Sequence, residues 1–286
     1  MNTVASLSRY IKEQLSETVE SEELQQFVLL IFDHLRGYNR VDLMMKGKEI
    51  LSEDEVYIIN EAVARLLKHE PLQYVLGQTE FMGSNIMVNG KVLIPRPETE
   101  ELVSWILDEH LNDNISVLDI GTGSGCIPIA IKQRRPRALV EAWDISGEAL
   151  EVAIGNAELN GVEVDFHHRD VLNFRKYELA TKDIVVSNPP YVTAKEKKMM
   201  KANVLDFEPH QALFVEDDEP LVFYKAIAEL AMVVLRPGGY LYFEINEAYG
   251  DELHAMLEGF GFKSVVRRKD LSGRWRMVRA IRQAHP

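Results

Sequence analysis

The chain has 286 residues, and at roughly 150 residues per domain this length predicts about two domains. Its formal net charge is -13, from 32 Lys and Arg against 45 Asp and Glu, and 46% of its residues are hydrophobic. This composition is typical of a folded globular protein and excludes disordered and low-complexity classes. The longest apolar run covers residues 27–32, far short of the ~18 apolar residues of a membrane span, so no membrane partner is expected.

Cysteine, histidine and charge limit the chemistry further. Cys126 is the single cysteine, which excludes an internal disulfide and a cysteine-based metal cluster. The eight histidines are scattered without the spacing of metal ligands, so we expect no metal site. The acidic net charge disfavours a nucleic-acid backbone as the main partner, although a local basic patch is compatible with it. The amino-terminal residues lack the apolar segment of a signal peptide, which favours a cytoplasmic protein.

Helices dominate the first third of the chain. Apolar residues recur at helical spacing over residues 24–35, with Ser21 expected as the N-cap. A second helix is expected from Ser52, because Ser52 and Glu55 have the spacing of a capping box. Neither helix belongs to the strand–loop–helix order of a nucleotide-binding unit. Residues 1–76 are therefore expected to form a small helical domain.

A short β segment and a linker follow. The pattern is β-like over residues 81–94, and Asn89–Gly90 is a strong signal for a hairpin turn. Pro95, Arg96 and Pro97 then favour a rigid entry into a helix, with Pro97 near its first position. We expect a β-hairpin linker over residues 77–95.

Strands and helices alternate in the remainder of the chain. Strands are expected over residues 116–120, 138–144, 163–167, 183–187 and 240–244. Helices are expected over residues 126–134, 147–160, 221–235 and 251–259. Two closing strands, over residues 262–268 and 275–281, follow each other without a helix between them. This order predicts an α/β domain over residues 96–286, with a doubly wound, Rossmann-like sheet and an antiparallel edge.

A glycine-rich loop joins the first strand of this domain to its first helix. It has the sequence Gly121, Thr122, Gly123, Ser124, Gly125, directly after Asp119 and Ile120. Glycines allow a tight turn and a close approach of a ligand, and the helix start offers free N–H groups. The G-x-G-x-G spacing differs from the G-x-G-x-x-G of dinucleotide folds. It suits the amino-acid and ribose parts of S-adenosylmethionine (SAM), which has no phosphate; a plain strand–helix turn is the alternative.

Acidic residues end the next two expected strands. Asp144 lies 23 residues after Gly121, where a carboxylate can accept hydrogen bonds from both ribose hydroxyls. The alternative for Asp144 is an acid favoured by the dipole of the following helix. Asp170, or the backbone beside it at Val171, is placed to meet the adenine, and an ordinary surface turn is nearly as good an interpretation.

The most specific motif is Asn188, Pro189, Pro190 and Tyr191, directly after the strand expected over residues 183–187. The two prolines remove two N–H donors, so the segment is rich in acceptors. The Asn188 side-chain oxygen and the Pro189 carbonyl can each accept one hydrogen from a planar –NH2 group, and Tyr191 supplies an aromatic face. Holding both N–H bonds orients the nitrogen toward a methyl group and stabilises the positive charge that develops on it. An Asn-Pro turn without this role is the alternative.

Together these motifs resemble the HemK/PrmC family of protein-(glutamine-N5) methyltransferases, which modify peptide chain release factors in translation termination. The resemblance extends over nearly the whole chain, through residues 70–74, 81–83, 93–100, 121–125, 188–191, 207–209 and 212–213. The Asn-Pro-Pro-Tyr motif is shared with nucleic-acid amine methyltransferases. The segment 93–100, together with a helical N-terminal domain, is much more particular to this family.

The resemblance implies a set of roles. S-adenosyl-L-methionine, with S-adenosyl-L-homocysteine as product, would be held by the loop residues Gly121, Thr122, Gly123, Ser124 and Gly125, and by Asp144, Val171 and Asn188. Asn188, Pro189, Pro190 and Tyr191 would bind the substrate glutamine, with Asn188, Pro189 and Tyr191 as the catalytic residues. The glutamine would come from the Gly-Gly-Gln motif of a class I release factor, which the domain of residues 1–76 would grip. The chain departs from the family pattern at Val171, near which an aromatic is usual, and at Asn246, where Gly is usual.

Two other functions stay open from the sequence. A DNA or RNA base-amine methyltransferase would have to flip a base into the same pocket, and the acidic net charge disfavours it. A SAM-binding regulatory module would need no catalytic motif, and the intact Asn188 motif disfavours it.

Overall fold

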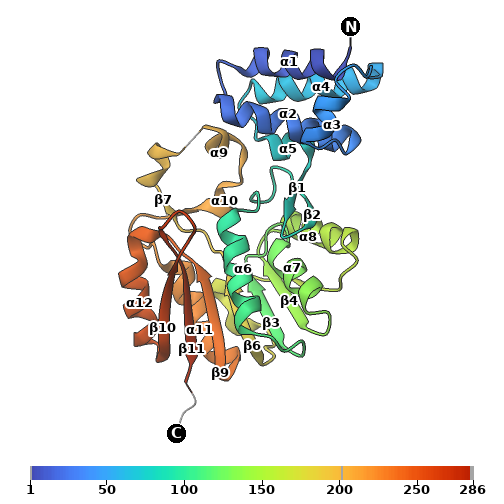
Figure 1. Cartoon of the computed structure of the whole chain (residues 1–286). Helices are drawn as coiled ribbons and strands as arrows, with labels where there is room; N and C mark the ends of the chain where they lie inside the picture. Colours follow the sequence, from blue (N-terminus) through green and yellow to red (C-terminus); the bar gives the residue numbers. More distant parts are fainter. Residues whose placement is uncertain (1, 201, 284–286) are drawn as a thin grey trace. The chain divides into compact units, whose positions relative to one another are not determined.

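The structure is a computed structural model that describes residues 2–200 and 202–283 (Figure 1). It divides into two compact units, Met1–Gln78 with Lys201–Phe207, and Thr79–Met200 with Glu208–Pro286. None of the described helices combines the length and the apolar composition that a membrane crossing requires.

The first unit is helical. Its helices are α1 (Val4–Leu15), α2 (Ser21–Arg36), α3 (Arg40–Met45), α4 (Glu53–Leu66), α5 (Leu72–Leu76) and α9 (Ala202–Phe207). The capping box at the start of α4 is confirmed, since the Ser52 hydroxyl accepts from the Glu55 N–H and the Glu55 carboxylate accepts from the Ser52 N–H. The N-cap expected at Ser21 is wrong by one residue. Glu20 has the extended backbone of an N-cap, and Ser21 is already helical.

A hairpin of β1 (Gln78–Phe81) and β2 (Ser84–Met87) follows. Its turn is made by Met82 and Gly83, whose φ angles of 50° and 80° match the left-handed positions of a tight hairpin turn.

The hairpin turn expected at Asn89–Gly90 is therefore wrong. Asn89 does form a turn, in which its carbonyl accepts from the Val92 N–H at 3.1 Å. The residues directly after this turn do not form a strand. Val92 and Ile94 are instead buried in the core as part of an irregular segment.

The second unit contains a seven-stranded sheet with the order β10-β11-β9-β6-β3-β4-β5. Its strands are β3 (Ser116–Ile120), β4 (Leu139–Asp144), β5 (Asp165–His168), β6 (Lys182–Ser187), β9 (Leu235–Glu244), β10 (Phe262–Lys269) and β11 (Trp275–Arg282). The strands from β9 to β5 are parallel, and β11 is antiparallel to both β9 and β10. The reversed strand is thus second from the edge. Because β3 has β4 on one side and β6 on the other, the strand order switches direction at β3, where ligands of such sheets bind.

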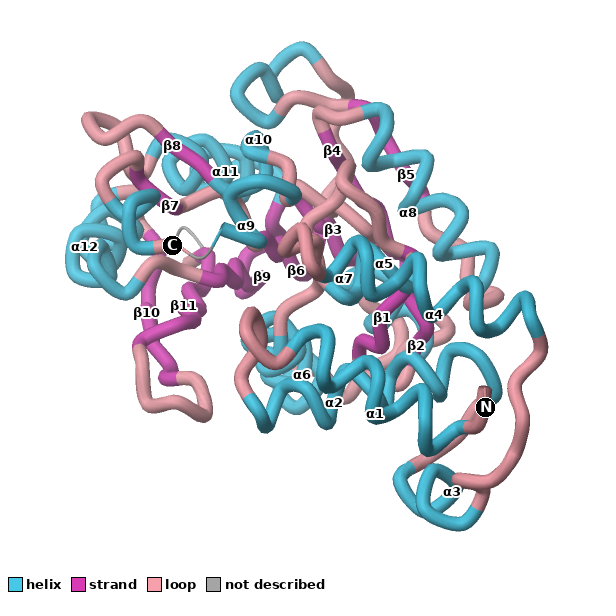
Figure 2. Tube along the Cα trace, turned by 90° about the horizontal axis from the view of Figure 1, so that it is seen from above, coloured by secondary structure: helices cyan, strands magenta, loops and turns pink. Residues whose placement is uncertain are grey.

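Helices cover both faces of this sheet. They are α6 (Pro97–Glu109), α7 (Cys126–Arg134), α8 (Gly147–Leu159), α11 (Val222–Val234) and α12 (Gly250–Gly259). Figure 2 looks roughly down the strands, which form a row across the picture, with α11 and α12 on one side of the row and α6 on the other. Pro97 occupies the first turn of α6, as expected, because a helix start has no use for the N–H that proline lacks.

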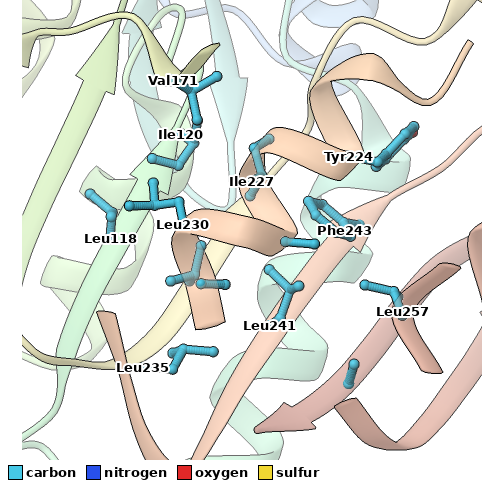
Figure 3. Packing of buried hydrophobic residues seen from close by; sticks show 14 of the residues in the cluster. Leu118, Ile120, Val171, Tyr224, Ile227, Leu230, Leu235, Leu241, Phe243 and Leu257 are labelled. Atoms are coloured by element: carbon cyan, nitrogen blue, oxygen red, sulfur yellow. The ribbon is translucent and has the colours of Figure 1, made fainter. Parts of the chain in front are cut away.

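The hydrophobic core between α11 and the sheet fixes the strands whose carboxyl ends lie at the site. Ile227 and Leu230 of α11 pack with Ile120 at the end of β3 and with Phe243 near the end of β9 (Figure 3). All four side chains are at most 3% exposed, and burying each of them stabilises the fold by roughly 1.5–3 kcal/mol. This packing therefore fixes the carboxyl ends of β3 and β9, which lie on the two sides of β6.

Short elements that the sequence pattern does not predict lie between the main ones. They are η1 (Val171–Lys176), β7 (Val192–Thr193), η2 (Glu196–Met199), α10 (His210–Leu213), β8 (Phe214–Val215) and η3 (Glu247–Tyr249). The pair β7 and β8 is parallel and ties the chain after the Asn188 motif to the segment that follows α10.

Candidate active site

A cavity lies at the carboxyl ends of β3, β4 and β6. Its empty volume is about 1260 Å³, including its open mouth. The sequence-predicted residues that line it are Gly121, Thr122, Gly123, Ser124, Asp144, Asp170, Val171, Asn188, Pro189 and Pro190. The structure thus brings residues from four separate loops to one place, as expected for the switch point of a doubly wound sheet.

The glycine loop is fixed against the neighbouring strand. The N–H groups of Gly121 and Thr122 both donate to the Trp143 carbonyl, at 2.8 and 3.0 Å. Gly125 does not line the cavity but has a packing role. Its φ is +78°, and a Cβ there would lie 3.1 Å from the Cβ of Ala153, so only glycine fits without displacement.

Asp144 connects the loop to the start of α8. One carboxylate oxygen accepts from the Gly123 N–H at 2.9 Å, and the other accepts from the Ser146 N–H at 2.8 Å. Burial raises the pKa of Asp144, and these backbone donors counteract part of that effect. Each carboxylate oxygen can accept a second hydrogen bond, so the geometry leaves room for two donors from a ligand.

Beyond β5 the chain turns along an apolar part of the cavity. Val171 is buried, and Leu172 next to it is 48% exposed. Asp170 uses both carboxylate oxygens within its own turn, one for the Leu172 N–H and one for the Asn173 amide. This arrangement supports the interpretation of Asp170 as a turn residue, and Phe223 is the aromatic side chain among the described residues of the cavity wall.

The Asn188 motif is held by side chains from other elements. The Asn188 amide nitrogen donates to the Thr99 hydroxyl at 3.2 Å, and Thr99 donates to Glu244 at 2.6 Å. The Tyr191 hydroxyl donates to the other oxygen of Glu244 at 3.0 Å. Burial raises the pKa of Glu244, whose side chain is only 1% exposed, and burial likewise raises that of Tyr191.

A second, smaller cavity adjoins the first at this motif. Its volume, with its open mouth included, is about 300 Å³. Tyr191 and Glu244 line it although they do not line the large cavity. Asn188 and Pro189 line both. The motif therefore forms the boundary between two cavities.

Asn246, where the family pattern has glycine, supports the same loop. Its amide nitrogen donates to the Tyr191 carbonyl at 3.2 Å and to both carboxylate oxygens of Glu196 at 3.0 Å. In this chain a side chain thus braces the segment that follows the motif.

Thr99 and Glu244 are the residues that the sequence interpretation missed. Glu244 ends β9, which pairs in parallel with β6 so that Ser187 lies beside Phe243. A polar residue at the carboxyl end of a strand next to the switch point is a usable signal for a site residue. Thr99 has a weaker signal, its place inside the segment 93–100.

The cavity suits SAM by the chemistry of its lining. Thr122 lines the cavity as part of the glycine loop, with its hydroxyl buried near Asp119. Asp144 can accept from two ribose hydroxyls, and Val171 and Phe223 provide apolar surface for a purine. The residues present therefore fit the amino-acid, ribose and adenine parts of this cofactor.

The fold and this cavity define a SAM-dependent methyltransferase. Residues 101–213 match the methyltransferase small domain, and residues 6–77 match the PrmC N-terminal domain. A 16S rRNA N2 G1207 methyltransferase from T. thermophilus, solved with AdoMet and guanosine, has a TM-score of 0.53. It is 18% identical, and the match covers 72% of this chain and 50% of that one, which shows a shared fold.

Two relatives define the family. The release factor glutamine methyltransferase of Bacteroides thetaiotaomicron is 45% identical over 96% of this chain and 99% of its own. That of Flavobacterium psychrophilum is 42% identical over 93% of this chain and 94% of its own. The chain belongs to the release factor glutamine methyltransferase family.

Proposed function

We propose that this chain transfers the methyl group of SAM to the side-chain amide nitrogen of a glutamine, in the Gly-Gly-Gln motif of a class I peptide chain release factor. The observation that carries the proposal is the position of Asn188 and Pro189, which line both the large and the small cavity. A cofactor in the large cavity and a glutamine side chain in the small one would meet at these two residues.

The chemistry needs acceptors more than a strong base. An amide nitrogen is a poor nucleophile because its lone pair is delocalised into the carbonyl group. In our proposal the Asn188 side-chain oxygen and the Pro189 carbonyl accept the two N–H hydrogens, which orients the nitrogen and stabilises the charge that develops on it. SAM supplies a methyl group on a positively charged sulfur. Transfer to the nitrogen would form the C–N bond as the C–S bond breaks, with S-adenosylhomocysteine as the leaving group, and the amide would then lose one proton to solvent.

Cofactor binding falls to the other side of the site. Gly121, Thr122, Gly123 and Ser124 would hold the amino-acid part, and Asp144 the ribose. Tyr191 would close the glutamine pocket, because its ring lines the small cavity while its hydroxyl is engaged by Glu244.

The helical unit is the proposed docking surface for the release factor. A second contact on one rigid partner raises the effective concentration of the glutamine at the pocket. We therefore expect the folded release factor to be a good substrate and a free Gly-Gly-Gln peptide to be a poor one, with the difference mainly in KM.

Methyl transfer from labelled SAM tests the proposal. The purified protein is incubated in parallel with a release factor, duplex DNA, and RNA, and mass spectrometry locates the methyl group. One methyl on the glutamine of Gly-Gly-Gln is the expected result. Label in DNA or RNA with an unmodified release factor would instead favour a base-amine methyltransferase.

A further inference from the structure

Two hydrogen bonds link Asn188 through Thr99 to the buried carboxylate of Glu244, and a third joins Tyr191 to the same carboxylate. The Asn188 amide nitrogen lies 3.2 Å from the Thr99 hydroxyl, which lies 2.6 Å from Glu244. Tyr191 approaches the other oxygen of Glu244, at 3.0 Å. Thr99 is 2% exposed and Glu244 is 1% exposed, so solvent does not compete for these bonds. The chain of bonds joins the start of α6, the loop after β6 and the end of β9.

The direction of these bonds follows from the chemistry of their members. Thr99 and Tyr191 each donate to one oxygen of Glu244, so the Thr99 proton points to the carboxylate. The Thr99 oxygen is then left to accept, and only the –NH2 group of Asn188 can donate to it. The side-chain oxygen of Asn188 must consequently lie on the opposite side of the amide.

We infer that Thr99 and Glu244 are positioning residues, which fix the amide of Asn188 so that its oxygen, and not its nitrogen, faces the substrate. The inference rests on the proposed function, since it assigns a role within that reaction. A flipped Asn188 would oppose its own –NH2 group to the –NH2 group of the glutamine, donor against donor. We call the linked hydrogen bonds of Asn188, Thr99, Glu244 and Tyr191 the relay. The relay thus leaves the Asn188 oxygen free to accept a hydrogen bond from the amide nitrogen of the substrate.

The surroundings of Glu244 are consistent with this direction. Burial raises the pKa of Glu244, whereas the hydrogen bonds from Thr99 and Tyr191 and the nearby positive charge of Arg276 lower it, and Glu98 adds a small opposing effect. Burial also raises the pKa of Tyr191, which keeps its hydroxyl protonated and donating. Both neighbours therefore point their protons at the carboxylate.

Substitutions at Thr99 test the inference. Thr99→Val keeps the shape and removes the hydroxyl, so Asn188 loses the partner that selects its orientation. We expect kcat for the release factor to fall by about tenfold or more, the scale of one lost hydrogen bond. Affinity for S-adenosylhomocysteine, measured by calorimetry, should stay unchanged. Thr99→Ser restores a hydroxyl with both roles, and kcat should return to within about twofold of the wild type.

A double-mutant cycle separates positioning from general structural damage. If Thr99 acts through Asn188, then Thr99→Val should cause no further loss of kcat in an Asn188→Ala background. Multiplied losses would contradict the inference. Ser116→Ala is the matched control, because it also removes a hydroxyl that donates to a carboxylate, Asp183 at 2.8 Å, at the opposite end of the sheet. Its kcat should equal that of the wild type.

The outcomes distinguish this inference from the proposed function. If the wild-type protein fails to methylate the release factor, the proposed function is wrong. If the wild type is active and Thr99→Val is equally active, or Thr99→Ser is as impaired as Thr99→Val, the positioning role is wrong. Should Thr99→Val not fold, Thr99→Ala leaves room for water beside Glu244, and the same losses and the same cycle are expected of it.

Discussion

In the proposed site, the cofactor side and the substrate side each contain a buried carboxylate, and the two carboxylates differ in their hydrogen bonds. Asp119 lies at 0% exposure in β3, two residues before Gly121, and the nearby Thr122 hydroxyl is its sole hydrogen-bonding neighbour among the described residues, without a well-formed hydrogen bond. Glu244 lies at 1% exposure on the substrate side and accepts from Thr99 and Tyr191.

This difference separates two ways of building a binding site. On the proposed cofactor side, Asp144 accepts from two backbone N–H groups, that of Gly123 in the glycine loop and that of Ser146 at the start of α8. On the substrate side, side chains far apart in the sequence form a directed relay. Loss of a cofactor-side group should weaken binding, whereas loss of a relay group should reduce turnover, because it changes which atom the substrate meets.

The largest expected effect is on the substrate side. Asn188→Ala removes one of the two proposed acceptors for the glutamine amide, and methyl transfer should fall by about 10²–10³-fold, as when an oxyanion-hole donor is lost. The affinity for S-adenosylhomocysteine should change little, because Asp144 and the loop are intact. Kinetics with labelled SAM and calorimetry measure the two effects separately.

The control for this variant is Asn112→Ala, a change in a turn before β3 where Asn112 accepts from the Asn114 N–H. It should leave turnover unchanged. Near-normal turnover of Asn188→Ala would remove Asn188 from the reaction and leave the relay without a purpose.

The next effect concerns the buried carboxyl group of Asp119. Burial, with a contribution from the charge of Asp144, raises the pKa of Asp119 to about 7, and the nearby Thr122 hydroxyl offsets part of this. The folded state therefore binds the proton more tightly than the unfolded state. The resulting stability is complete below the ordinary value of 3.8 and is lost as the pH rises through about 7.

Asp119→Asn tests this directly, because asparagine has the same shape and does not ionise. Between pH 5 and pH 7, Asp119 should lower the free energy of unfolding of the wild type by about 2 kcal/mol, and the variant should lack this decrease. Urea unfolding of both proteins at the two pH values gives the difference, from which other titrating groups cancel. If the free energy of unfolding changed with pH in the same way in both proteins, burial would not raise the pKa of Asp119.

A smaller effect is expected from the acid that does have partners. Asp144→Ala should weaken binding of S-adenosylhomocysteine by about 1–3 kcal/mol, since the two ribose hydroxyls of the proposed site and two backbone N–H groups would lose their acceptor. At saturating SAM, kcat should be nearly retained. Asp144→Asn, which keeps one acceptor oxygen, should lie between the two proteins. A loss of kcat without a loss of affinity would contradict the division between the two sides.

The two sides also differ in how far they could be predicted from sequence. Strand β3 and helix α7 have the predicted bounds, because an apolar strand, a glycine loop and a helix are consecutive in the chain. Glu244 and Thr99 were missed because they are 145 residues apart and meet only after β9 has paired beside β6. No local pattern encodes such a contact.

The misplaced hairpin turn has a different cause. Met82 has a positive φ of 50°, which is rare for a residue other than glycine. A methionine is therefore not a signal for a turn at that position. Asn89–Gly90 carries the signal and does form a turn, but the residues after it are buried in the core instead of pairing as a strand. Tertiary packing outweighed local turn preference at both positions.

The smallest effect should come from the brace behind the relay. Asn246→Gly, which introduces the residue usual in the family pattern, removes the amide bonds to the Tyr191 carbonyl and to Glu196. Each such bond contributes about 0.5–1.5 kcal/mol, so the melting temperature should fall modestly. Turnover should change only slightly, because Tyr191 is still held by Glu244 through its hydroxyl.

Asn246→Asp sharpens the test, since it keeps the acceptor for the Ala248 N–H but places a second carboxylate next to that of Glu196. It should destabilise the protein more than Asn246→Gly. If either variant instead abolished turnover in a folded protein, the loop after the motif would belong to the catalytic machinery and not to its support.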